Sequence, residues 1–181
     1  MGQQSNATAP LDAIGLTGAD AGVIRARKRP VKDIDYGFVG DVERVDSTQF
    51  TTFLHNGLVP IVAPLTFEPI TGSMLNTNAD TIASVLAISL SKHFDVRLIF
   101  CFEKQGVLTD VTKEDSVIRN LNQSLYKDLL AKGSFHDGIL PKLENAFHAI
   151  QSGVKEVLIG EHTHLLANTG YDTRGTLITQ S

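Results

Sequence analysis

The stretch Gly72-Ser73-Met74-Leu75-Asn76-Thr77-Asn78-Ala79-Asp80 joins an extended apolar run to a second apolar segment, residues 82–90. Asn78 is a good helix N-cap, and Asp80 in the first turn would complement the positive end of the helix dipole. Asn76 lies before the cap and has no capping role. With Asp80 it would place polar groups near a helix N-terminus, where anions bind readily. The stretch therefore predicts either a plain helix start or a ligand site, and these residues alone leave both open.

Composition restricts the class of protein. At 181 residues with 42% hydrophobic and 20% charged residues, the chain can bury a full core, which excludes a disordered or fibrous protein. The net charge of -4 and a pI near 5.8 argue against a nucleic-acid surface. No segment reaches the ~18 consecutive apolar residues of a membrane span, and no export signal is present. Cys101 is the only cysteine, so no internal disulfide can form, and we expect a cytoplasmic protein. Because Cys101 lies in an apolar run, we expect it in the core rather than as a nucleophile.

Strands and helices are expected to alternate along most of the chain. Residues 1–10 are small and polar and predict a tail or loop, so the domain spans residues 11–181. Extended segments are predicted at 11–17, 23–29, 36–45, 58–64, 96–102, 156–160 and 175–178, with 23–45 forming a hairpin. Helices are predicted at 48–56, 79–92, 123–131 and 140–151. This alternation predicts a layered α/β domain with a mainly parallel sheet, in which 96–102 is buried on both faces.

A second polar loop precedes the last predicted helix. In residues 136–145 a glycine turn is followed by Pro141 at the helix start and Lys142 in the first turn. The helix dipole disfavours a lysine there, so Lys142 needs a reason such as a bound phosphate. A solvated surface lysine is the alternative.

These segments resemble those of a known family. Residues 74–80 are similar to the substrate and catalytic motif of the acetylglutamate kinases, and residues 137–146 resemble the second catalytic motif of that family. Supporting similarities occur, in the family's order, at 15–20, 39–42, 57–64, 106–108 and 175–176.

The resemblance implies the amino-acid-kinase fold, a three-layer α/β/α sandwich. It implies transfer of the γ-phosphoryl group of ATP, with Mg²⁺, to the side-chain carboxylate of N-acetyl-L-glutamate in arginine biosynthesis. By motif position, Asn76 would hold the substrate, Asp80 would organise the catalytic centre and Lys142 would stabilise the transferring phosphoryl group. The residues implied to border the nucleotide are Glu103, Lys104, Gln105, Gly106, Val107, Leu108, Ser134, Phe135 and His136. The segment 102–105 departs from the Asp-containing turn common in the family.

One departure concerns the start of the chain. The family begins with a lysine-containing, glycine-rich strand end, a second glycine-rich loop and an arginine, and none of these precedes Leu11. We therefore expect an N-terminally truncated enzyme with impaired activity, whose uncovered apolar surface favours a homo-oligomer. The alternatives are an N-succinylglutamate kinase or another branch of the amino-acid kinases, and a catalytically silent nucleotide-binding or assembly module. His162 and His164 have metal-ligand chemistry but lack further partners in sequence, so no protein metal site is predicted.

Overall fold

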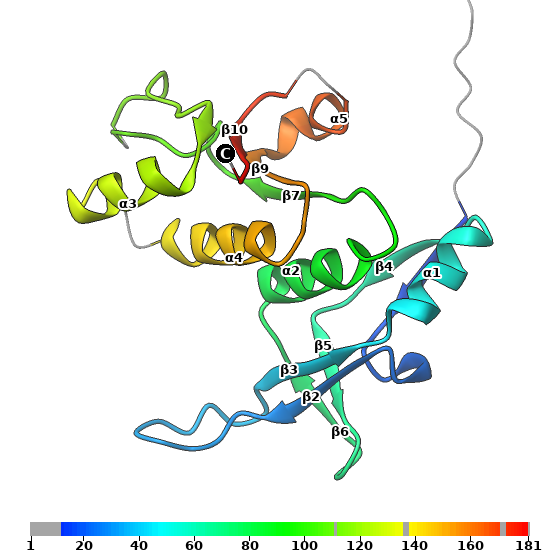
Figure 1. Ribbon diagram of the computed structural model, residues 1–181. Coiled ribbons are helices and arrows are strands. Elements are labelled where there is room, and N and C mark those ends of the chain that lie inside the picture. The colour runs from blue at the N-terminus through cyan, green and yellow to red at the C-terminus, as the bar shows by residue number, and fades with distance from the viewer. Residues whose placement is uncertain (1–11, 111, 136–137, 171–172, 181) are drawn as a thin grey trace, which may run out of the picture. The chain divides into compact units, whose positions relative to one another are not determined.

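The chain folds as two compact units. The computed structural model describes residues 12–110, 112–135, 138–170 and 173–180, and the units are Met1–Thr77 and Asn78–Ser181. In Figure 1 the first unit runs from blue into green and the second from green to red. The boundary falls inside the stretch 72–80, immediately before Asn78.

The first unit contains two sheets. Strands β1 (Ala13–Leu16) and β4 (Val59–Val62) pair in parallel as a two-stranded sheet. The four-stranded sheet has the order β3-β2-β5-β6 and consists of β2 (Ile24–Lys28), β3 (Gly40–Val45), β5 (Leu65–Glu68) and β6 (Ser73–Asn76).

Two hairpins build the four-stranded sheet. The antiparallel pair β2 and β3 confirms the hairpin predicted at 23–45. The second hairpin, β5 with β6, turns through Gly72, whose φ of 72° suits a residue without a side chain. Ser73 to Asn76 is thus a strand, whereas the sequence indicated only a junction before a helix.

Helix α1 (Ser47–His55) packs against β4 in the first unit. The carboxylate of Asp46 caps it by accepting hydrogen bonds from the backbone N–H groups of Thr48 and Gln49, at 3.1 and 3.3 Å. The helix predicted at 48–56 is confirmed, with both ends one residue earlier. A short 3-10 turn, η1 (Asp20–Gly22), follows β1, and there Asp20 accepts hydrogen bonds from the backbone and hydroxyl of Thr17.

The second unit is built on one mixed sheet. Its strands are β7 (Arg97–Phe102), β8 (Asn120–Leu121), β9 (Glu156–Glu161) and β10 (Thr176–Ile178), in the order β7-β9-β10-β8. Pairs β7–β9 and β8–β10 are parallel, and β9–β10 is antiparallel. The predicted α/β class is confirmed, with both kinds of strand pairing present.

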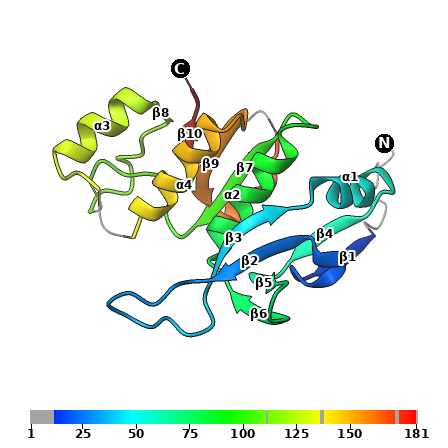
Figure 2. The same cartoon turned by 60° about the horizontal axis from the view of Figure 1, so that its bottom comes forward.

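Helices cover the sheet of the second unit. They are α2 (Ala79–Leu90), α3 (Gln123–Ala131), α4 (Leu140–Gln151), the short α5 (Leu165–Asn168) and the 3-10 turn η2 (His162–His164). Helices α2 and α4 pack on each other and on β7 and β9, as Figure 2 shows, and Figure 1 places α5 across the sheet from them. The hydrophobic core of this unit includes Phe100, Leu143, Phe147 and Ile159. The predictions for α3 and α4 are confirmed at both ends.

Strand β7 corrects one expectation. Leu98 and Phe100 are buried, but Cys101 is exposed, so this strand buries one face rather than two. Within the described part of the chain β7 is an edge strand, paired only with β9. A continuous apolar run cannot show which face of a strand is covered, and the expectation that Cys101 lies in the core was therefore wrong. Among the described residues, no helix is long and apolar enough to cross a membrane.

The exposure of Cys101 predicts its reactivity. In the native chain its thiol should react with a maleimide at nearly the rate measured in urea, because no packed side chains have to move first. Mass spectrometry over a time course measures the two rates, and Cys101→Ser is the unlabelled control. Labelling that is more than about tenfold slower in the native chain would contradict the exposed position.

Candidate active site

Asn76 ends strand β6 with an exposed side chain and a fixed backbone. Its N–H donates a hydrogen bond of 2.7 Å to the carbonyl of Phe38, and Val39 forms a parallel bridge with it. The segment 38–39 is the end of the long loop between β2 and β3. That loop therefore fixes the backbone from which the predicted substrate residue projects.

A buried polar cluster lies directly after Asn76. The hydroxyls of Thr66 and Thr77 are 2.9 Å apart, and Thr77 also donates to the carbonyl of Gly40 at 3.2 Å. Thr66 donates to the carbonyl of Leu75 at 3.2 Å. Both threonines are almost fully buried, at 0% and 4% exposed. Because a buried hydroxyl without partners is costly, this cluster favours one backbone path past Asn76.

The cluster requires a glycine at position 40. A Cβ there would lie 2.7 Å from Thr66 Oγ1 and 2.8 Å from Leu75 Cβ. Gly40 belongs to the segment 39–42, one of the similarities noted in the sequence. The structure supplies a physical reason for that part of the resemblance.

Asp80 lies in the first turn of α2. The side chain of Asn78 caps this helix by accepting a hydrogen bond of 3.1 Å from the N–H of Thr81, as predicted. Asn78 therefore caps the helix, and the carboxylate of Asp80 is left for a contact with a charged group.

Lys142 lies in the first turn of α4, one residue after Pro141. Its ammonium group donates to both carboxylate oxygens of Asp80, at 2.8 and 2.7 Å, and lies 5.4 Å from the ring centre of Phe100. The Lys142 and Asp80 side chains are 18% and 27% exposed. The ion pair is the local compensation for a lysine at the positive end of a helix. A solvated surface lysine is excluded.

This arrangement holds a positive charge in a fixed place. An ammonium group has three N–H donors, and Asp80 takes two of them. The third is available to an anionic oxygen, and partial burial strengthens that attraction relative to water. The pair brings together Asp80 and Lys142, which are 62 residues apart in sequence.

The segment predicted to border the nucleotide follows strand β7. Among the described residues, a small hollow is lined by the predicted Glu103, Lys104, Gln105 and Leu108, together with Glu114 and Glu161. Gly106 and Val107 are buried, and the N–H of Val107 donates to the hydroxyl of Thr176 at 2.8 Å.

The remaining predicted nucleotide residues differ in their setting. Ser134 and Phe135 are described by the structure but are not among the described residues that line this hollow or the pocket next to it. The ring of Phe135 stacks on Tyr126 at 5.7 Å and packs against the core. His136 lies outside the described residues.

A larger pocket of about 460 Å³ adjoins Gln105 and was missed by sequence reasoning. Its lining includes Arg119, His164 and Arg174. Arg119 and Arg174 come from segments far apart in sequence, and each stands alone, so no local motif marks them. The two guanidinium charges suit an anionic group such as a phosphate.

The donor set for a divalent cation is limited. The part of the chain that the structure describes holds no group of three or more His, Cys, Asp or Glu side chains able to bind a metal. Mg²⁺ commonly binds through substrate phosphates, water and one or two carboxylates, rather than in an all-protein cage.

The fold and the ion pair define a class of α/β proteins that hold a lysine in the first turn of a helix by pairing it with an aspartate. The model of the Amino acid kinase family matches residues 5–161. That match covers most of the chain, so the chain belongs to the amino acid kinase family.

Individual relatives agree with this assignment. The acetylglutamate kinase of Bacteroides fragilis is 56% identical over 149 residues, which cover 82% of this chain and 57% of the relative. That of Bacteroides thetaiotaomicron is 51% identical over 168 residues, covering 93% and 63%. The chain thus spans about three fifths of their length. The solved N-acetylglutamate synthase of Neisseria gonorrhoeae has a TM-score of 0.78 over 98% of this chain and 40% of its own, at 19% identity, which shows the fold alone.

Replacement of Gly40 tests the buried cluster. Gly40→Ala should lower the free energy of unfolding by about 1–3 kcal/mol, because the added methyl overlaps Thr66 and Leu75. Gly15→Ala is the matched control, because a Cβ there meets no atom within 4 Å, and we expect a change within about 0.5 kcal/mol. Urea denaturation measures both. Equal losses in the two variants would contradict the role of the cluster.

Proposed function

We propose that the protein is an acetylglutamate kinase. It transfers the γ-phosphoryl group of ATP to the side-chain carboxylate of N-acetyl-L-glutamate in arginine biosynthesis. The observation that carries this proposal is the Asp80–Lys142 pair, formed between the two segments that resemble the catalytic motifs. The identity to acetylglutamate kinases, above 50% over most of this chain, supports the same substrate.

The reaction needs charge neutralisation and alignment rather than a base. A glutamate side chain is already ionised near neutral pH, so its oxygen attacks phosphorus without losing a proton. A bond forms between that oxygen and the γ-phosphorus, and the bond from phosphorus to the oxygen of the leaving ADP breaks. In such loose transition states negative charge spreads over the transferring group and the leaving oxygen.

Each residue has a part in this step. Lys142 donates its free N–H to the transferring phosphoryl group, where its charge offsets the developing negative charge. Asp80 holds that ammonium in position and is not a proton acceptor. Asn76 orients the acylglutamate, and its backbone is fixed by Phe38 and the buried threonines. Mg²⁺, when bound with ATP, would neutralise the outer phosphates.

Nucleotide binding is proposed for the loop after β7. Glu103 to Leu108 border the nucleotide, and the basic pocket beside Gln105 supplies Arg119 and Arg174 to its phosphates. A second lysine on a glycine-rich strand is expected from outside these 181 residues. The homo-oligomer and the cytoplasmic location remain predictions.

Two alternatives stay distinct. An N-succinylglutamate kinase would share the same lysine and differ in the groups that grip the acyl end. A silent nucleotide-binding or assembly module would bind ATP without turnover.

An assay of completed and uncompleted chains tests the proposal. The chain joined to the part of the Bacteroides fragilis enzyme that it does not cover should release ADP from ATP in the presence of N-acetylglutamate and Mg²⁺. The 181-residue chain alone should bind ATP with little or no turnover. ADP release is followed by a coupled spectrophotometric assay. Turnover by the short chain would contradict the need for a second lysine, and an inactive completed chain would favour the silent module.

The roles of the site residues are tested in the completed chain. Lys142→Met should lower kcat by about 10²–10³-fold, because a charge acting on the transition state is lost. Lys155→Met is the matched control, since Lys155 also pairs with an aspartate, at 3.0 Å, but on the exposed surface. Asn76→Ala should raise the KM for N-acetylglutamate by about tenfold and leave that for ATP unchanged. Equal losses of kcat in the two lysine variants would remove Lys142 from the mechanism.

A further inference from the structure

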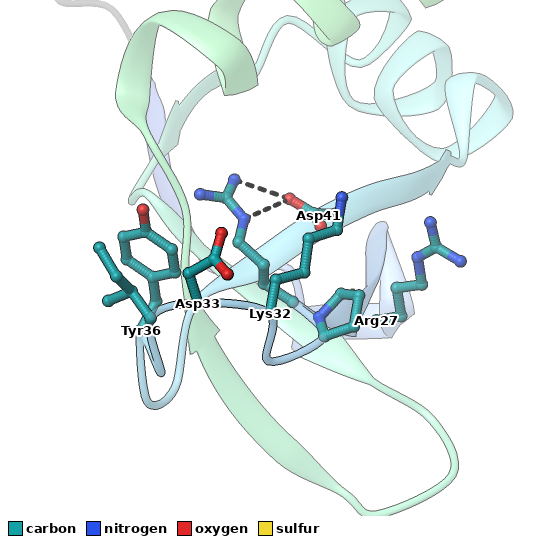
Figure 3. A pocket seen from close by; sticks show the side chains of 8 residues that line it. Arg27, Lys32, Asp33, Tyr36 and Asp41 are labelled. Atoms are coloured by element: carbon teal, nitrogen blue, oxygen red, sulfur yellow. Dashed lines mark hydrogen bonds and ion pairs between the residues drawn. The ribbon is translucent and has the colours of Figure 1, made fainter.

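A pocket that the proposed kinase reaction does not use lies in the hairpin of β2 and β3. It encloses about 380 Å³ between strand ends and the loop that joins them, residues 29–39. Figure 3 shows the side chains that line it. Residues 25–29 form a basic run in the sequence. In the structure two of its arginines, Arg27 and Arg29, belong to the lining of this pocket.

Arg29 and Asp41 form a prearranged part of the lining. Arg29 donates from Nε and Nη2 to the same oxygen, Asp41 Oδ1, at 3.0 and 2.7 Å, as the dashed lines in Figure 3 mark. Its guanidinium also lies 5.5 Å from the ring centre of Tyr36. Hydrogen bonding to Asp41 raises the pKa of Arg29 above its ordinary value, so it stays charged. Arg29 Nη1 has no partner among the described residues and remains able to donate.

The other charged side chains of the lining have weaker ion pairs or none among the described residues. Arg27 has one ion pair, 3.7 Å from Glu43, and its side chain is 65% exposed. Within the described part of the chain, Lys32 and Asp33 form no ion pair. The lining carries three cations, Arg27, Arg29 and Lys32, against two carboxylates, Asp33 and Asp41. The lining residues alone therefore carry one excess positive charge, which the exposed Glu43, 3.7 Å from Arg27, offsets only in part.

One side of the pocket is apolar. Ile34 and Tyr36 both belong to its lining, and both are more than half exposed. Large apolar side chains exposed together commonly mark a binding surface. An aliphatic or aromatic group placed against them would remove this surface from water.

We propose that this pocket binds a small organic monoanion, a carboxylate with an aliphatic or aromatic body. The carboxylate lies between Lys32, Arg27 and the free Nη1 of Arg29, and the body lies against Ile34 and Tyr36. A phosphate dianion fits less well, because it would leave the lining with an excess negative charge. The ligand uses none of the residues assigned to phosphoryl transfer, so the site stands whether or not the kinase function does.

Titration with benzoate, followed by ¹H–¹⁵N chemical shifts, tests the site. A ligand of this size should saturate with a Kd on the order of 1–10 mM and shift the amides of residues 29–39. Benzylamine has the same ring with a positive charge, and we expect no saturable shifts. Inorganic phosphate should bind more weakly than benzoate.

Two variants with the same loss of charge separate the pocket from general surface attraction. Lys32→Gln should raise the Kd for benzoate at least about fivefold. Lys28→Gln should change it less than about twofold, because the Lys28 ammonium lies over Phe38, 5.1 Å from the ring centre, and does not line the pocket. Absence of saturable benzoate binding, equal binding of benzylamine, or equal effects of the two variants would overturn the proposal.

Discussion

The ion pair between Asp80 and Lys142 is the contact on which the proposed chemistry of the second unit depends. Each partner lies in the first turn of a helix, where the backbone favours negative charge. Asp80 suits that position, but Lys142 does not, and the lysine is held there by the two oxygens of Asp80. Packing of α2 against α4 brings the two first turns together. The positive charge is therefore in place before any phosphate binds.

In the first unit, hydrogen bonds fix the backbone at Asn76. Buried hydroxyls of Thr66 and Thr77, with the carbonyl of Gly40, leave little freedom to the backbone around it. Hydrogen bonding to Phe38 ties the same backbone to the long loop of the β2–β3 hairpin. The proposed transfer needs a positive charge and a substrate-binding residue. The ion pair with Asp80 holds Lys142, and the buried threonine cluster holds the backbone of Asn76.

Local signals predicted much of this fold. Periodic apolar residues and turn residues defined α3 and α4 at both ends, and Asn78 marked the start of α2. The β5–β6 hairpin was missed because the polar residues around Asn78 indicated a helix start and not the strand that precedes it. Exposure of Cys101 depends on which face of β7 is covered, and the basic pocket with Arg119 and Arg174 gathers distant single residues. Local sequence contains neither kind of information.

Binding of a transition-state mimic tests the central role of Lys142 most directly. ADP with Mg²⁺ and aluminium fluoride, in the presence of N-acetylglutamate, imitates the transferring phosphoryl group in the completed chain. Lys142→Met should weaken this complex by about 50-fold or more, while the Kd for ATP changes by less than about threefold. An equal weakening of both would show that Lys142 contributes only to ground-state binding, which would contradict the account.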